Sequence, residues 1–450
     1  MTHATHAARP TRESAAGRGS NRTEASGASH DIHRAGPAGY AELHRRFAPV
    51  FAGIAEGALE RDLHRQLPFE AVARLDDAGF GALRVPAEHG GAGASVETFA
   101  RLLIDLAAAD SNVAHLYRSH FGFCESLRWQ ADGVRRDWYA RILSGQTVGN
   151  ASTERGGNAL GTLNTTLSRD ADGWVLDGAK YYATGTIFAT HTRVSAAVPG
   201  EAGRVFVVVP TAADGVGVSD DWDGFGQRLT GTGTATFSGV RVEDADVFDR
   251  VSGTAEAVHE AAFFQLVLLA VLAGIARAAR DDAAATVATR TRTFNTGSGL
   301  PFREDPLIQQ LVGRIASKAY AAEATVLAAA RSLDRALAAS PDRPGEAPPE
   351  AHLAELEVEQ AQVIVPELAL GAAQQLFETV GASATSSAKG LDRHWRNAQT
   401  VATHNPIAFR ARSVGDYFVN GTLPEGLNAI GEAPATSPGG AAPTAAPAGP

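Results

Sequence analysis

The chain is almost free of sulfur. In 450 residues, Cys124 is the one cysteine and the initiator Met1 is the one methionine. A single cysteine excludes an intramolecular disulfide and a thiolate-rich metal site, so we expect no metal centre of that kind. A fold that needs no disulfide is typical of a cytoplasmic protein, and this is the location we expect.

Positive charge and long apolar runs are also scarce. The formal net charge of -10 argues against a nucleic-acid groove, because such grooves cluster Lys and Arg against phosphates. The most apolar run, Phe263–Ala276, contains Gln265 and is short of the roughly 20 residues that span a bilayer. We interpret this run as a buried helix and expect neither a nucleic-acid nor a membrane partner. In the glycine-rich loop at 88–93, no phosphate-binding Gly-x-Gly-x-x-Gly motif follows a strand, and we give His89 no role.

The two ends of the chain have compositions that cannot bury a core. Residues 1–36 lack apolar periodicity, and residues 431–450 are mostly Ala, Pro, Gly and Ser. We therefore predict disordered tails at both ends and a folded body between them.

Three domains are predicted from the hydrophobic periodicity of the body. Residues 37–145 show helical spacing, with Asp110 or Ser111 as a helix N-cap. Residues 146–253 alternate with a period of two, and Asp-Gly pairs at 172–173, 177–178 and 214–215 are typical of turns between strands. Residues 254–430 return to helical spacing, with long helices expected at about 256–290, 304–338 and 350–380.

Several motifs follow one another in a distinctive order. The N-terminal part contains Leu83-Arg84-Val85-Pro86 and Glu88-His89-Gly90-Gly91. The β part contains 150–154 (Asn-Ala-Ser-Thr-Glu), 178–185 (Gly-Ala-Lys-Tyr-Tyr-Ala-Thr-Gly), 220–226 (Asp-Asp-Trp-Asp-Gly-Phe-Gly) and 230–234 (Thr-Gly-Thr-Gly-Thr). The C-terminal part contains 377–384 (Phe-Glu-Thr-Val-Gly-Ala-Ser-Ala), 391–397 (Leu-Asp-Arg-His-Trp-Arg-Asn) and 403–406 (Thr-His-Asn-Pro).

Taken together, these motifs resemble the flavin-dependent monooxygenase branch of the acyl-CoA dehydrogenase superfamily, to which dibenzothiophene monooxygenases and related sulfur-acquisition oxidoreductases belong. The resemblance covers nearly all of the folded body. It implies a mainly α fold with a central β domain: an N-terminal helical domain, a β-barrel-like middle domain and a C-terminal four-helix bundle that packs into a homotetramer.

The resemblance also bears on the catalytic residues. An acyl-CoA dehydrogenase needs a glutamate that removes a substrate proton. No carboxylate occurs between Asp392 and Asp416, and the alternative position corresponds roughly to Phe264-Gln265, with Glu260 one turn earlier. The resemblance therefore implies that the dehydrogenase base is missing from its usual places.

Two histidines, His120 and His404, match the active-site histidines of the monooxygenase branch. Imidazole ionises near neutral pH, which suits a residue that controls the proton of a flavin C4a-hydroperoxide. The resemblance implies this role and substrate contact for His120 and His404, with Thr184 hydrogen-bonded to the flavin or the peroxide. We interpret His115 and His394 as structural, and Cys124 as a small buried apolar residue.

The same resemblance implies the residues that bind the flavin. Asn150, Ser152 and Trp222 are expected at the ring and ribityl chain, and Arg292 at the phosphate. The Ser383 region is expected to complete the phosphate site from a neighbouring subunit. Here the chain departs from dibenzothiophene monooxygenase, which has arginine at this position and glycine at that of Ala384.

The function implied by these features is a two-component monooxygenase that oxygenates a small organosulfur substrate with O2. It would use reduced FMN supplied by a separate NAD(P)H flavin reductase, since nothing in the chain resembles a nicotinamide site. Three alternatives stay open: an acyl-CoA dehydrogenase that holds FAD, a flavin-dependent N-hydroxylase of an amine, and a relative that has lost the flavin.

Overall fold

The computed structural model describes residues 37–155, 163–201, 203–249, 251–291, 293, 297–340 and 345–424. The tails predicted at 1–36 and 431–450 lie outside these ranges, and so does Arg292. All statements below concern the described residues.

The N-terminal part is helical because its apolar residues recur on one face of each helix. In the first helix the buried side chains are Leu43, Phe47, Phe51 and Ile54. Asp110 accepts a hydrogen bond from the backbone N of Asn112, which confirms the predicted N-cap. The helices of this part are α1 (Tyr40–Glu56), α2 (Ala58–His64), α3 (Phe69–Asp77), α4 (Val96–Ala109), α5 (Ser111–Leu116), α6 (Arg118–Ser126) and α7 (Asp132–Leu143).

The middle part contains eight strands among the described residues, in two four-stranded sheets ordered β1-β4-β5-β8 and β2-β3-β7-β6. Strand β1 pairs parallel with β4, and the other pairings are antiparallel. Side chains of both sheets share one apolar core, as the alternating pattern of the sequence predicts. The strands are β1 (Val148–Ala151), β2 (Thr166–Asp170), β3 (Gly173–Tyr181), β4 (His191–Ala196), β5 (Val205–Pro210), β6 (Val216–Val218), β7 (Thr234–Val242) and β8 (Val247–Asp249).

One predicted turn in this domain is wrong. Turns do occur at 172–173, between β2 and β3, and at 214–215, between β5 and β6. The pair Asp177-Gly178 instead lies inside β3, where the register with β7 shifts between Leu176 and Gly178. Gly178 has a φ of 143°. A β-bulge needs the same permissive backbone as a turn, so the Asp-Gly signal does not distinguish the two.

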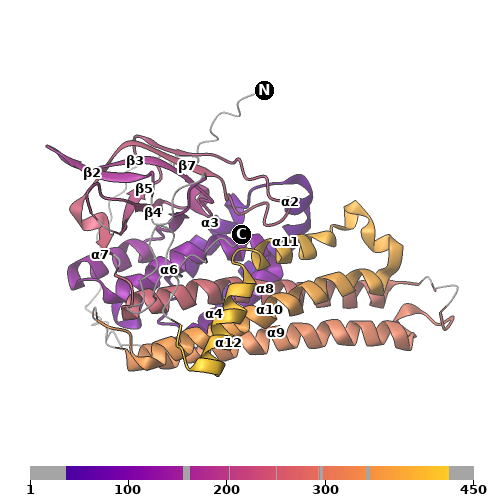
Figure 1. Cartoon of the computed structure of the whole chain (residues 1–450). Coiled ribbons are helices and arrows are strands. Elements are labelled where there is room, and N and C mark those ends of the chain that lie inside the picture. Colours follow the sequence, from indigo (N-terminus) through magenta and orange to yellow (C-terminus); the bar gives the residue numbers. More distant parts are fainter. Residues whose placement is uncertain are drawn as a thin grey trace, which may run out of the picture. The chain divides into compact units, whose positions relative to one another are not determined.

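The C-terminal part is built on three long helices, which run side by side in Figure 1. Their bounds confirm the predicted helices to within two residues: α8 (Ala255–Thr289), α9 (Pro306–Ala339) and α10 (Pro349–Val380). Two shorter helices, α11 (Asp392–Ala402) and α12 (Ile407–Asn420), pack against α10. Asp305 caps α9, and Pro306 occupies its first turn.

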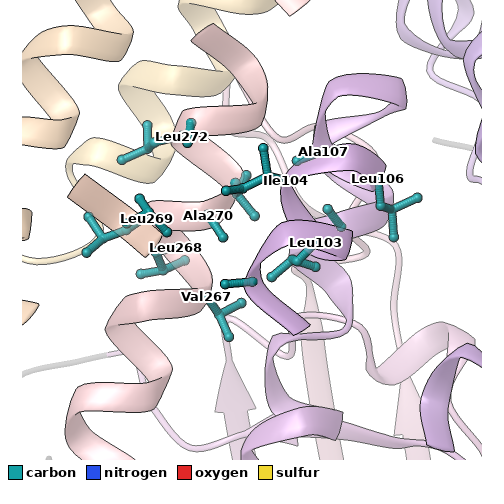
Figure 2. Close-up of a cluster of buried hydrophobic side chains, with 14 of the residues drawn as sticks. Leu103, Ile104, Leu106, Ala107, Val267, Leu268, Leu269, Ala270 and Leu272 are labelled. Atoms are coloured by element: carbon teal, nitrogen blue, oxygen red, sulfur yellow. The ribbon is translucent and has the colours of Figure 1, made fainter. Parts of the chain in front are cut away.

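Helix α8 joins the C-terminal bundle to the N-terminal helices. Figure 2 shows apolar side chains of α4, such as Leu103 and Ile104, facing those of α8, such as Val267. A Cβ at Gly274 would lie 2.4 Å from the Cβ of Ala107, so glycine allows the two helices to approach closely. By length and composition α8 could cross a membrane, but most of its apolar window is buried inside the protein. It is the core helix of the fold, as predicted for Phe263–Ala276.

A buried ionic network fixes α6 against α8 and the loop before α4. Arg84 donates from Nε to Glu125 Oε1 at 2.5 Å and from Nη2 to Oε2 at 3.0 Å. His259 lies 2.8 Å from the same carboxylate through Nε2. The three side chains are at most 6% exposed. Burial of these charges is tolerated because each is paired and hydrogen-bonded.

We expect Glu125→Gln to destabilise the protein by about 3–5 kcal/mol, because Arg84 would keep a buried charge without its counter-ion. The measurement is the free energy of the first transition in guanidinium denaturation. Glu70→Gln is the matched control, since Glu70 pairs with Arg74 on the surface of α3 and should change stability by less than about 1 kcal/mol. Equal effects of the two substitutions would contradict the prediction.

Candidate functional site

Three of the predicted site residues meet at one edge of the β domain. Ser152 Oγ donates to Asn150 Oδ1 at 2.9 Å, and the backbone N of Asn150 donates to the carbonyl of Thr184 at 3.3 Å. Asn150 Nδ2 lies 3.5 Å from the carbonyl of Tyr182. The end of β1 and the segment after β3 therefore form one polar cluster, although they are far apart in sequence.

Two aromatic rings flank this cluster. The rings of Tyr182 and Trp222 lie 6.0 Å apart and nearly perpendicular. Tyr182 is 49% exposed and has a φ of 75°, a backbone conformation that costs energy for a tyrosine. Strained residues of this kind gather at ligand sites. Tyr182 is a further candidate site residue that the sequence did not reveal, although it stands within the motif at 178–185.

The acidic residues beside Trp222 anchor its loop. Asp220 pairs with Arg65 of the N-terminal domain at 2.7 Å. Asp221 accepts from the backbone N and the hydroxyl of Thr234 at 2.7 and 2.6 Å, which fixes the loop to the start of β7. Trp222 Nε1 donates to the carbonyl of Gln227 at 3.0 Å. The motif at 220–226 thus holds an indole at a defined place by polar contacts on both sides.

Gln227 connects the β domain to the helices around the candidate site. It is 1% exposed and has a φ of 49°. Its backbone N donates to Asn397 of α11 at 2.7 Å, and its side-chain Nε2 donates to Ser111 at 3.2 Å. Its side-chain Oε1 lies 3.2 Å from Nδ1 of His115. One residue of the β domain therefore contacts both helical domains through buried hydrogen bonds.

A chain of hydroxyls leads from Thr184 to the same residue. Thr184 Oγ1 lies 2.8 Å from Thr232 Oγ1, and Thr232 Oγ1 lies 2.7 Å from Thr230 Oγ1. Thr230 Oγ1 donates to the carbonyl of Gln227 at 2.9 Å. Thr184 is therefore connected to the loop of Trp222 by contiguous hydrogen bonds.

His115 points its Nδ1 at Gln227, and this contact sets its tautomer. Because Gln227 Oε1 can only accept, His115 carries its hydrogen on Nδ1 and keeps a lone pair on Nε2. Burial, and then the positive charge of Arg118, lower the pKa of His115 to about 4. The imidazole is therefore neutral at pH 7. The structural interpretation of His115 is incomplete, because a buried neutral imidazole with one unused nitrogen is equipped for chemistry.

His120 has a different environment from the one its predicted role requires. Its Nε2 lies 2.8 Å from the carbonyl of Gly81, and its Nδ1 accepts from the backbone N of Val148 at 3.3 Å. Both ring nitrogens are thus bound to the backbone, and the side chain is 1% exposed. Burial lowers its pKa to about 4. This geometry favours a structural link between α6 and β1 through His120, whose catalytic role stays a prediction, and His115 is a further candidate histidine.

His404 follows α11 and approaches α8 through its neighbour. Asn405 Nδ2 donates to Gln265 Oε1 at 2.8 Å. Desolvation by surrounding protein atoms lowers the pKa of His404 well below its ordinary value, and the positive charge of Arg118 acts in the same direction. The His404 side chain is exposed and lines a small cavity together with Gln265 and Asn405.

The candidate dehydrogenase base is not available. Glu260 lies on α8, is 4% exposed, and forms an ion pair with Arg193 of β4. At the next positions along α8, Phe264 and Gln265 cannot act as bases. The described site therefore offers imidazoles, and its one buried carboxylate on α8 is neutralised by a guanidinium.

The predicted phosphate residues are only partly described. Ser383 accepts from Arg290 Nη1 at 2.9 Å within the same chain, and the same group contacts the carbonyl of Val380. Arg292, two residues further on, lies outside the described residues. His394 pairs with Asp282 at 2.8 Å, as its structural interpretation implies. Cys124 is buried, 3.7 Å from His120 Nε2.

The residues at this edge fit a planar heteroaromatic group. Two aromatic side chains, an amide and two hydroxyls lie together, and the exposed ring of Tyr182 offers an apolar surface beside polar partners. Among the described residues no group of three or more His, Cys, Asp and Glu side chains could hold a metal ion. The aromatic, amide and hydroxyl groups at this edge are of the kind that bind an organic cofactor.

The pH dependence of stability tests the burial of His120. Its pKa falls from 6.5 in the unfolded chain to about 4 in the fold. Above pH 6.5 both states are neutral. As pH falls from about 6.5 to about 4, the unfolded chain takes up a proton first, so stability should fall by up to about 1.4 kcal/mol per pH unit.

The comparison uses His120→Gln, which should show a shallower loss of unfolding free energy over this pH range than the wild type. His64→Gln is the control, since His64 is exposed on α2 and its removal should leave the slope unchanged. If the unfolding free energies of all three proteins fell in parallel with pH, the pKa of His120 would not be lowered by burial as expected.

Known proteins resemble this chain along its whole folded length. Residues 42–146, 150–240 and 266–409 match the N-terminal, middle and C-terminal domains of acyl-CoA dehydrogenase. A dibenzothiophene monooxygenase of Mycolicibacterium goodii is 28% identical over 81% of this chain and 91% of its own length. A probable FMNH2-dependent monooxygenase, SfnC, of Pseudomonas putida is 27% identical over 82% of this chain and 93% of its own length.

Solved structures give the same result. FMN-bound TdsC from Paenibacillus sp. A11-2 superposes with a TM-score of 0.77 at 27% identity, over 85% of this chain and 99% of that chain. The methanesulfinate monooxygenase MsuC from Pseudomonas fluorescens also gives a TM-score of 0.77 at 27% identity, over 84% of this chain and 97% of that chain. The expected fold class is confirmed. With all three domains matched in order, the chain belongs to the acyl-CoA dehydrogenase family, and its relatives include flavin monooxygenases.

Proposed function

We propose that the protein is a two-component, FMN-dependent monooxygenase that transfers one oxygen atom of O2 to a small organosulfur compound. The observation that carries the proposal is the pair of neutral histidines, His115 and His404, at a site where Glu260 is tied up in an ion pair. The relatives named as dibenzothiophene, methanesulfinate and FMNH2-dependent monooxygenases support it.

The cluster at the edge of the β domain would hold the flavin. Asn150 and Ser152 supply an amide and a hydroxyl for its polar atoms, and Trp222 with Tyr182 supplies aromatic surface for its ring. Thr184 would contact the flavin through its hydroxyl. Arg292 and Ser383 are proposed for the phosphate, and Arg290 stands beside Ser383. Bound reduced FMN supplies the two electrons that activate O2 for transfer of a single oxygen atom.

The histidines would control the protons of that reaction. His115 has a free Nε2 lone pair and a tautomer fixed by Gln227, so it can accept a proton but does not release one at pH 7. His404 is kept neutral beside the charge of Arg118. Two neutral imidazoles at the site would hold protons in place and favour oxygen transfer to the substrate over release of hydrogen peroxide.

Reduced FMN would come from a separate NAD(P)H flavin reductase, which the relative named as FMNH2-dependent supports. We further propose a homotetramer in the cytoplasm. Several large apolar side chains of the C-terminal helices are exposed, which supports association through the bundle. They are Leu307 and Tyr320 of α9 and Phe409, Phe418 and Val419 of α12.

The activity test supplies photoreduced FMN and oxygenated buffer, then measures oxygenated product and hydrogen peroxide. The wild type should oxygenate an organosulfur compound and leave amines unchanged. His115→Gln and His404→Gln should lower the yield of product by on the order of a hundredfold and release peroxide instead, because proton control is lost. His64→Gln, on the surface of α2, is the control and should match the wild type.

Two results would contradict the proposal. Turnover of amines with no product from organosulfur compounds would favour an N-hydroxylase. Bleaching of FAD bound to the protein by an acyl-CoA would favour a dehydrogenase, which the ion pair of Glu260 with Arg193 argues against.

The tetramer is tested by sedimentation of the full chain. We expect four copies per particle at micromolar concentration. Phe418→Asp should lower the assembly state, because a charge would enter an apolar contact of α12, where Phe418 is 69% exposed in one protomer. Leu143→Asp is the control at the exposed end of α7, 40% exposed, and should leave the tetramer intact. A wild-type monomer would reject this part of the proposal.

A further inference from the structure

One guanidinium at the candidate site has no acidic partner of its own. Arg118 begins α6, three residues after His115, and is half-buried. Its Nε donates to the carbonyl of Phe264 at 3.0 Å, and its Cζ lies 4.6 Å from the centre of the Phe264 ring. These two contacts fix the plane of the guanidinium and leave both Nη groups without a hydrogen-bond acceptor among the described residues.

Arg118 also acts on both histidines of the site, His115 and His404. Its Nε contact reaches α8 at Phe264, and Asn405, the residue after His404, reaches the adjacent Gln265 at 2.8 Å. The charge of Arg118 acts on His115 and on His404. The same turn of α8 therefore receives the guanidinium from one side and the His404 segment from the other.

The surroundings do not neutralise this charge. The carboxylate that acts on Arg118 is Glu260, and this carboxylate is already ion-paired with Arg193. Burial lowers the pKa of Arg118 to about 10, which still leaves it protonated at pH 7. Since His115 and His404 are held neutral, the site carries an uncompensated positive charge.

A neutral substrate would bury the charge of Arg118 without giving it a counter-ion, whereas an oxyanion would form an ion pair with it. Two coplanar Nη groups bind two oxygens of one anionic group. A half-buried cation with free donors is costly unless an anion completes it. The ring of Phe264 stands beside the guanidinium and offers an apolar surface for a carbon substituent.

We propose that Arg118 is a substrate-binding residue and that the substrate class is a small organic sulfur oxyanion, of which an alkanesulfinate is the form that can still accept oxygen at sulfur. The proposal rests on the proposed function and narrows it. In the reaction, the sulfur lone pair forms a bond to one oxygen atom of O2 and the sulfinate becomes a sulfonate. The other oxygen leaves as water with the two hydrogens of reduced FMN, so sulfur and flavin each lose two electrons and O2 gains four.

The test measures binding of sodium methanesulfinate to the purified protein by calorimetry, with and without oxidised FMN. Dimethyl sulfone is the neutral probe, since a methyl group replaces the anionic charge at similar size. The wild type should bind methanesulfinate at least about tenfold more tightly than dimethyl sulfone. Arg118→Leu keeps the packing on Phe264 and should remove this preference, and Arg118→Lys should keep part of it.

Arg314→Leu is the charge-matched control. Arg314 is exposed on α9, and its loss should change neither binding nor turnover. The affinity of all variants for FMN should stay within about twofold of the wild type, because Arg118 contacts the substrate and not the flavin. In turnover, Arg118→Leu should raise the KM for methanesulfinate far more than it lowers kcat.

The outcomes separate this inference from the function on which it rests. Unchanged methanesulfinate binding in Arg118→Leu overturns the inference, and so does a loss of FMN affinity, which would assign Arg118 to the flavin. Oxygenation of neutral sulfur compounds with no turnover of methanesulfinate keeps the proposed function and overturns the inference. Failure of the wild type to oxygenate any sulfur compound, with intact Arg118-dependent binding, overturns the proposed function alone.

Discussion

The buried hydrogen bonds of Gln227 hold the three domains of the candidate site in register. This residue donates to Asn397 of the C-terminal bundle, receives the indole of Trp222 within the β domain, and fixes His115 of the N-terminal domain. The contacts with Asn397 and His115 join parts of the chain that are far apart in sequence, so these two contacts form only when the domains assemble. Moving Gln227 would break buried hydrogen bonds of its backbone and of both polar atoms of its side chain, which costs free energy. These bonds therefore fix the indole of Trp222 relative to the imidazole of His115.

Electrostatics give this site its particular character. Dehydrogenation in this fold calls for a carboxylate that removes a proton, yet the buried carboxylate on α8 is paired with Arg193. Burial and the nearby guanidinium of Arg118 keep the imidazoles in their neutral form. The scaffold is thus the same, but the site offers neutral imidazoles where dehydrogenation calls for a charged carboxylate. A cation among neutral groups then selects what can enter.

Much of the fold could be predicted from the sequence because its signals are periodic. The long apolar helices and the β domain follow from spacing, whereas the pair Asp177-Gly178 was misleading because bulges and turns require the same backbone freedom. Only some of the candidate site residues could be predicted from the sequence. Asn150 and Trp222 lie in motifs with fixed spacing, but His115 and His120 share one helical pattern. The helix is interrupted at Tyr117, so the two imidazoles face different surroundings. The local sequence does not show how such an interruption rotates the second helix relative to the first.

The hydroxyl chain behind Thr184 has a direction. Thr230 must give its hydrogen to the carbonyl of Gln227, so Thr232 gives its own to Thr230 and Thr184 gives its own to Thr232. Thr184 is left with lone pairs and no hydrogen to offer. A ligand atom that meets it must therefore bring a hydrogen. The carbonyl of Gln227, which is three hydrogen bonds away, thereby makes Thr184 distinguish a ring nitrogen that carries a hydrogen from one that does not.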